Sequence, residues 1–173
     1  MKKFFSLLIV SILLFSLCSC DSLEDALDAL DAAKVKTFQV ENLSIDLNEN
    51  FYRMDRLAEQ FDFCISSEDM VIFGSRVDFA ENDLTGVSLW DYAEAFRNNM
   101  DQSTMSELTD LNGIPTMQYE AYDNDNDNEK QIVFIALYEA SDCFWMLQFI
   151  SEKDDFRENA PLIHQYAQSV KCN

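Results

Sequence analysis

Three apolar runs in the second half of the chain most constrain its fold. Ile114–Tyr122, Gln131–Tyr138 and Cys143–Ile150 have the composition of strands, and connections of hairpin length separate them. The last two runs are apolar at almost every position, which is typical of strands covered on both faces. This half of the chain therefore predicts a sheet in which these two runs are the central strands.

The first half predicts further strands. The apolar residues from Thr37 to Leu47 indicate two short strands, which are ended by the polar sequence that follows them. Phe61–Ser66 and Met70–Phe79 then predict a strand pair, because the second run places its apolar residues on one face at a period of two. The turn between them is expected at residues 66–69.

Two helices are predicted beside these strands. Ser88 can cap a helix because Asp91 stands three residues later, a variant of the capping box. Pro161 fits the first turn of a second helix, which we expect to run to the chain terminus. Strands that pair in sequence, with only two helices among them, favour an α+β fold. We expect a mainly antiparallel sheet of about six strands flanked by helices, in one domain over residues 37–173.

The N-terminus has the order of a secretory signal. Lys2 and Lys3 precede an apolar run that is too short to span a bilayer, since a transmembrane helix needs about 20 apolar residues. The run ends in Leu17-Cys18-Ser19-Cys20, which resembles the bacterial lipobox. That resemblance implies a signal peptide over residues 1–19 and acylation of Cys20 after cleavage.

The alternative is a plain signal peptide with an accidental cysteine. If Cys20 is acylated, the protein is expected in the bacterial cell envelope, anchored to the inner or the outer membrane by more than one acyl chain. Residues 20–36 carry leucines at helical spacing among acidic residues, so they are either an acidic tether or a short helix.

The charge of the chain restricts its partners. It has 32 acidic and 12 basic residues, a formal net charge of −20, so it would repel nucleic acid and gain nothing from counterion release. We therefore expect no nucleic-acid partner. Cationic partners or metal ions are compatible with this charge, although a well-solvated surface explains it equally.

The order of elements resembles the PsbP-like α/β/α sandwich family, which includes DcrB-like lipoproteins. The resemblance covers roughly residues 38–171, and five features carry it: Ser44-Ile45-Asp46-Leu47, Ser88-Leu89-Trp90-Asp91-Tyr92-Ala93, Leu111-Asn112-Gly113-Ile114-Pro115, the aromatic strands through Phe149, and the final stretch from Asp155-Phe156 to Val170. It implies a sandwich domain and a non-catalytic binding or assembly role. No functional residue of the family transfers to this chain.

One acidic segment is a candidate metal site. Asp123, Asp125 and Asp127 have the spacing of the first half of an EF-hand calcium loop. The second half does not fit, because Asn128 stands where glycine is needed and Phe134 where the bidentate glutamate belongs. The other interpretation is a polar hairpin tip between two strands.

Catalytic groupings are scarce. His164 is the only histidine, and we expect it to be a structural or surface residue, since no G-x-S-x-G, H-E-x-x-H or glycine-rich phosphate loop is present. Cys64 and Cys143 lie in apolar runs and are expected to be buried, while Trp90 and Trp145 are expected in the core.

The favoured function is thus a lipid-anchored, non-catalytic envelope protein that binds an envelope protein or a small ligand, without a cofactor. The alternatives are an envelope hydrolase whose carboxylate pair forms on folding, or an acidic cation-binding protein.

Overall fold

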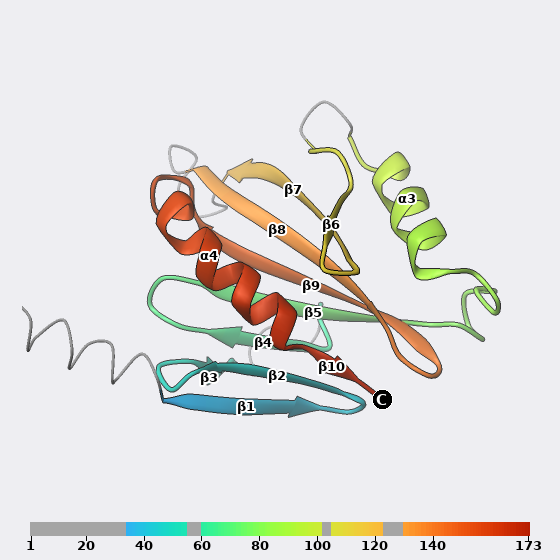
Figure 1. Cartoon of the computed structure of the whole chain (residues 1–173), viewed down its shortest axis with the longest axis horizontal. Helices are drawn as coiled ribbons and strands as arrows, with labels where there is room; N and C mark the ends of the chain where they lie inside the picture. The colour runs from blue at the N-terminus through green and yellow to red at the C-terminus, as the bar shows by residue number, and fades with distance from the viewer. Residues whose placement is uncertain (1–33, 55–59, 102–104, 123–129) are drawn as a thin grey trace, which may run out of the picture. The chain divides into compact units, whose positions relative to one another are not determined.

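The computed structural model describes residues 34–54, 60–101, 105–122 and 130–173 (Figure 1). Residues Lys36–Asn173 form one compact unit. Its strands are β1 (Val35–Val40), β2 (Leu43–Asn48), β3 (Tyr52–Arg53), β4 (Phe63–Ser66), β5 (Val71–Asp78), β6 (Thr109–Leu111), β7 (Ile114–Tyr122), β8 (Lys130–Glu139), β9 (Cys143–Glu152) and β10 (Lys171–Cys172). Its helices are α3 (Leu89–Asn99) and α4 (Lys153–Ser169).

The main sheet has seven strands in the order β3-β4-β5-β9-β8-β7-β6. Every neighbouring pair in it is antiparallel. The predicted α+β class and mainly antiparallel sheet are therefore confirmed, and the two most apolar runs, β8 and β9, lie inside the sheet as predicted. The expected number of about six strands was slightly low, because β3 and β6 have only two and three residues and leave no periodic signal.

A second sheet of three strands has the order β1-β2-β10. The β1–β2 connection is the two-residue turn Glu41–Asn42, in which Glu41 has a positive φ of 47°. β10 pairs antiparallel with β2, so that Cys172 lies opposite Leu43. The prediction that the last helix runs to the terminus was therefore wrong: α4 ends at Ser169, and the chain returns to the second sheet.

The alternation of side chains along the strands gives the main sheet two apolar faces. On the first, which we call the α4 face, the side chains pack against α4 and the second sheet, and Figure 1 shows α4 lying across the strands. The buried sheet residues of this face are Phe63, Ile65, Ile72, Phe134, Ala136, Tyr138, Cys143, Trp145, Leu147 and Phe149. The opposite face packs against α3, with Met117, Val133, Ile135 and Leu137 buried there. The domain is thus a sheet with one helix against each face.

The two helices begin differently. Ser88 caps α3 as predicted, since its Oγ accepts a hydrogen bond from the Asp91 N–H at 3.1 Å and donates one to the Asp91 carboxylate at 2.6 Å. α4 begins at Lys153, eight residues before Pro161, so the prediction that Pro161 stands in the first turn was wrong. The first two turns of α4 are mostly polar and acidic, and they lack the apolar stripe from which a helix is predicted. Within the described residues, no helix is long and apolar enough to cross a membrane.

Candidate functional site: a groove between α4 and β7

A groove of about 340 Å³ lies on the α4 face, between α4 and the hairpin formed by β6 and β7. We call it the α4–β7 groove. Its lining residues are Ser106, Thr109, Asp110, Leu111, Thr116, Met117, Gln118, Phe134 and His164. Its volume falls at the lower end of the range of about 300–1,000 Å³ that small-ligand sites occupy. The groove can therefore hold a short ligand or a few side chains of a partner.

The β6–β7 hairpin forms one wall. Its turn is Asn112–Gly113, and both residues have positive φ, 55° and 89°. These angles suit the two-residue type I′ turn, whose twist matches that of the flanking strands, and Asn-Gly is the favoured sequence for it. The Asp110 carboxylate accepts a hydrogen bond from the Gly113 N–H, which fixes Asp110 beside the turn.

The register of β7 explains which side chains reach the groove. Thr116 lies opposite Ala136 and Gln118 opposite Phe134, so these side chains project from the α4 face. Pro115 pairs with Asp110 on β6, and the β7–β8 ladder begins only after it, at Thr116. The proline therefore stands where its missing N–H costs no ladder hydrogen bond.

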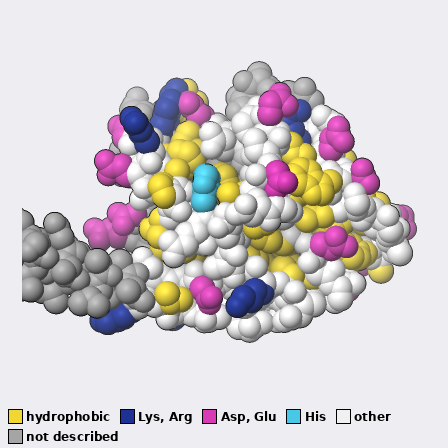
Figure 2. Space-filling view, in the orientation of Figure 1, with side chains coloured by type: hydrophobic (Ala, Val, Ile, Leu, Met, Phe, Trp, Pro, Cys, Tyr) yellow, Lys and Arg dark blue, Asp and Glu magenta, His cyan; other side chains and the backbone are white. Residues whose placement is uncertain are grey.

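The other wall comes from α4, and the floor from β8. His164 is exposed on α4, and its ring lies 5.2 Å from that of Phe134, measured between centroids, at 44°. Figure 2 shows this histidine, the only one in the chain, at the surface with apolar side chains beside it. The expectation of a surface histidine agrees with this position, but the sequence did not indicate that it would line a groove.

Several polar groups of the groove have no protein partner. Thr109 and Thr116 bond to each other, with their hydroxyl oxygens 2.9 Å apart. The Gln118 amide and the His164 imidazole, in contrast, form no hydrogen bond with any described residue. Since both side chains are exposed, their donors and acceptors are available to a ligand.

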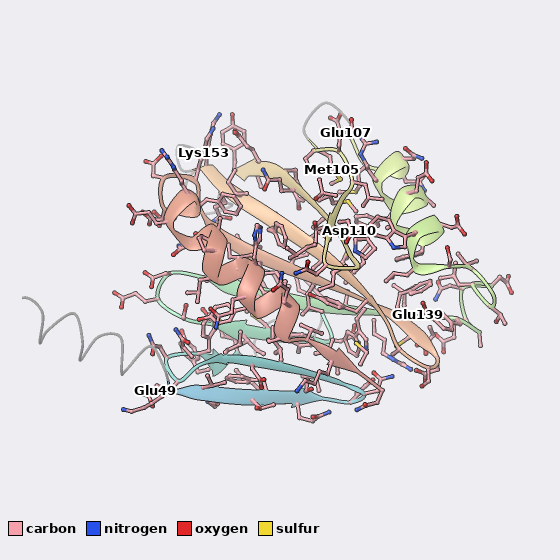
Figure 3. The ribbon with its side chains drawn as sticks, in the orientation of Figure 1. Glu49, Met105, Glu107, Asp110, Glu139 and Lys153 are labelled. Atoms are coloured by element: carbon pink, nitrogen blue, oxygen red, sulfur yellow. The ribbon has the colours of Figure 1, made fainter. Side chains whose placement is uncertain are left out.

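The Asp110 carboxylate belongs to the opposite face of the sheet. Asp110 pairs with Pro115, whereas its neighbours Thr109 and Leu111 lie opposite Thr116 and Ile114 on the α4 face. Glu120, further along β7, pairs with Lys130 and with Lys153 at the start of α4, and hydrogen bonding to Lys153 is the main reason that its pKa is lowered. Figure 3 shows Asp110 and Lys153 at well-separated places.

A smaller hollow of about 180 Å³ lies where the β4–β5 turn approaches the start of α4. Its acidic lining residues are Glu68, Asp69, Glu152 and Asp155. No set of three histidine, cysteine or acidic residues within the described ranges could hold a metal ion, here or elsewhere.

The remaining predicted residues fall in different places. Cys20 and the acidic set Asp123, Asp125 and Asp127 lie outside the described residues. Cys64 and Cys143 are buried as expected, and Trp145 is in the core. Trp90 is 40% exposed, so its expected place in the core was wrong. It is the second residue of α3, next to Leu89.

Sequence reasoning missed Gln118. The alternation of Thr116, Gln118 and Glu120 along β7 was a signal that one face of this strand is polar.

Comparison with known proteins gives the fold and no more. No protein-family model and no curated protein matches the sequence. Among solved structures, the chain has the α+β fold of PsbP-like proteins: it is similar to the solution structure of cyanobacterial PsbP (CyanoP) from Synechocystis sp. PCC 6803, with a TM-score of 0.52 and 12% identity over 82% of this chain and 94% of that one. It is also similar to a crystal structure from Bacteroides thetaiotaomicron VPI-5482, with a TM-score of 0.50 and 8% identity over 82% of this chain. This chain spans only 49% of that protein.

Proposed function

We propose that this chain is a lipid-anchored, non-catalytic binding or assembly protein of the bacterial cell envelope, and that its sandwich domain binds a partner in the α4–β7 groove. The observation that carries the binding role is the open groove, in which Gln118 and His164 present unused polar groups beside the Phe134 ring. Concave sites of this kind, with a few convergent polar groups, are the usual places for ligands.

A binding role is favoured over catalysis by the chemistry of the groove. A general base needs a nucleophile within hydrogen-bond reach and a third group to orient it. His164 has a ring contact with Phe134 but no hydrogen bond to a described carboxylate or hydroxyl. The hydroxyls of Thr109 and Thr116 are engaged with each other.

The envelope location rests on the sequence before the domain. The basic start, the short apolar run and the serine before Cys20 support cleavage after Ser19 and acylation of the new N-terminal cysteine. Intact-mass analysis of the native protein should find residue 20 at the N-terminus, carrying a thioether-linked diacylglyceryl group and an amide-linked acyl chain. A leader still attached, or a free thiol on Cys20, would refute the anchor.

The binding role can be tested in cells by site-specific photo-crosslinking. A photoreactive phenylalanine analogue at position 118 faces the groove, whereas the same analogue at Glu94, exposed on α3, faces away from it. We expect the analogue at position 118 to crosslink one protein reproducibly, and the analogue at position 94 not to crosslink that protein. Equal crosslinking from both positions, or none from 118, would contradict the proposal.

A further inference from the structure

Two cysteines lie at the same end of the space between the two sheets. Cys143 is the first residue of β9 and is fully buried in the apolar cluster on the α4 face, and Cys172, on β10, packs against the same cluster. Cys172 lies opposite Leu43 on β2, so both side chains project from the same side of the second sheet. Because Leu43 is part of that cluster, the Cys172 side chain faces the main sheet.

Hydrogen bonds fix this corner of the domain. The Asn173 N–H donates to the Asn42 carbonyl at 2.9 Å, and the Asn173 carbonyl accepts from the Ser141 N–H at 3.3 Å. Figure 1 shows the C-terminus, which follows β10, beside the β1–β2 turn. The Asn42 Nδ2 atom in turn lies 3.7 Å from the Cys143 Sγ atom. The residue after Cys172 is therefore bonded to the turn that precedes Cys143 and to the residue whose side chain contacts the Cys143 thiol.

The two thiols also interact electrostatically. Burial raises the pKa of Cys172 to about 11, and the charge of Cys143 contributes to this rise. Burial likewise raises the pKa of Cys143, whereas Asn42 and the Arg76 guanidinium favour its thiolate and act in the opposite direction. Because like charges disfavour each other only at short range in a folded protein, this coupling agrees with the shared position of the two sulfur atoms.

The third cysteine of the described chain lies on the other face of the main sheet. Phe63 and Ile65, the neighbours of Cys64 on β4, are both buried in the cluster on the α4 face. Since side chains alternate along a strand, Cys64 projects to the opposite side. The sheet therefore separates Cys64 from the other two thiols.

We propose that Cys143 and Cys172 form an internal disulfide, while Cys64 stays a free thiol. This inference rests on the envelope location proposed above, because the bacterial periplasm is an oxidising compartment in which disulfides form and persist. The bond closes a loop that runs from Cys143 through β9 and α4 to Cys172. Since α4 is one wall of the α4–β7 groove, the bond also holds that wall in the closed loop.

The oxidant is a second disulfide, either that of a thiol oxidoreductase or oxidised glutathione. Cys172 is partly exposed, so its thiolate attacks one sulfur of the oxidant, forms a mixed disulfide and releases the other sulfur as a thiolate. The Cys143 thiolate then attacks the Cys172 sulfur and releases the second thiolate. One S–S bond thus replaces another, two electrons pass to the oxidant, and the two protons lost by the cysteines pass to the two thiolates that leave.

The first experiment uses the full chain isolated from membranes, with free thiols alkylated at lysis by N-ethylmaleimide. Mass spectrometry of the unreduced digest should find residues 143 and 172 in one linked peptide pair, and Cys64 alkylated. Reduction should lower the midpoint temperature of thermal unfolding by about 5–15 °C. Alkylated Cys143 and Cys172 in a protein that carries the acyl chains on Cys20 would overturn the disulfide and leave the anchor standing.

The second experiment tests the pairing without the envelope. Reduced, purified protein incubated with oxidised glutathione should form the same bond, about tenfold faster for each pH unit between 7 and 9, since the thiolate fraction of a group with a pKa of about 11 grows by that factor. Cys172→Ala should abolish the bond, and the matched control Cys64→Ala should keep it. A bond through Cys64, or no bond, would overturn the inference. If the native protein lacks the acyl chains, the proposed location fails and this experiment alone decides the pairing.

Discussion

The α4 face of the main sheet has two halves that differ in how they are covered. Over β4, β5 and β9, the second sheet and α4 bury large side chains such as Phe63, Trp145 and Phe149. Over β7, the corresponding side chains are Thr116, Gln118 and Glu120, and the α4–β7 groove is left open. We call these regions the filled half and the open half.

Hydrogen bonds and ion pairs also stabilise the filled half. Trp145 Nε1 donates to the Asn42 side chain at 2.8 Å, and Arg76 pairs with Asp78 and with Asp142 at 2.8 Å each. Asn42 belongs to the β1–β2 turn, so its bond to Trp145 joins the two sheets, whereas Asp142 belongs to the β8–β9 turn and its pair with Arg76 lies within the main sheet. In the open half, the exposed pair of Glu120 with Lys153 joins β7 to α4. We expect stability to depend mainly on the filled half and binding on the open one.

The largest effect is expected from Trp145→Ala. Trp145 is fully buried against Phe63, and its removal leaves a large cavity and an Asn42 oxygen without its donor. We expect the free energy of unfolding to fall by about 3–5 kcal/mol. Urea denaturation followed by circular dichroism measures this change.

Trp145→Phe is the control for that experiment. Phenylalanine keeps most of the side-chain volume but loses the hydrogen bond to Asn42. Trp145→Phe should therefore lower the free energy of unfolding by clearly less than Trp145→Ala does. A loss for Trp145→Ala below about 1 kcal/mol would show that the filled half does not determine stability.

Gly74→Ala should have the next largest effect. Gly74 lies opposite Phe63 in the β4–β5 pair, and a Cβ on it would come within 2.0 Å of the Phe63 ring. Since Phe63 packs against Trp145, its ring has little room to move, and we expect a loss of about 1–3 kcal/mol.

The companion Phe63→Leu variant makes this prediction specific. Leucine is shorter than phenylalanine and leaves more room beside Gly74. Gly74→Ala should therefore lower the free energy of unfolding by less in the Phe63→Leu protein than in the unmodified protein, and a double-mutant cycle measures this coupling. If the losses of the two single variants simply add, the contact between the new Cβ and the Phe63 ring is relieved by another movement, and this explanation is wrong.

The open half predicts the opposite behaviour for Gln118→Ala. Its side chain is exposed and bonds to no described residue, so the free energy of unfolding should change by less than about 0.5 kcal/mol. Thermal unfolding followed by circular dichroism measures this change. Gln165→Ala, at an exposed position beside His164 on α4 but outside the groove lining, should leave the free energy of unfolding equally unchanged.

The sequence predicted the filled half better than the open half, for a physical reason. Long buried strands must be apolar, so β8 and β9 were recognisable from composition alone, and the Ser88 cap of α3 depends only on local residues. Strands β3, β6 and β10 have two or three residues each and exist because a longer neighbour pairs with them. Such elements leave no periodic pattern.

The groove depends on those unpredictable elements. One wall exists because β6 pairs with β7, which brings Thr109 beside Thr116, and the other because α4 packs across the sheet and brings His164 beside Phe134. The residues that the sequence marked most clearly, Cys20 and the alternating aspartates, lie outside the described part of the chain. A site assembled from a short edge strand, a turn and one helix face thus becomes visible only in three dimensions.

The smallest effect is expected from Glu120→Gln, which tests the charge pairing of the open half. Lys153 and Lys130 lower the pKa of Glu120 in the folded state, so the stabilisation is present above the usual pKa of 4.5 and is lost as the pH falls through the lowered value. The variant should therefore unfold at a slightly lower temperature than the unmodified protein at pH 7, and this difference should shrink as the pH falls below 4.5 and through the lowered pKa of Glu120.

Lys153→Met should reproduce this pattern, because it removes the main partner. A difference that does not shrink as the pH falls would mean that residue 120 contributes packing rather than charge, and the open half would then be more closely tied to the stability of the fold than its exposed side chains suggest.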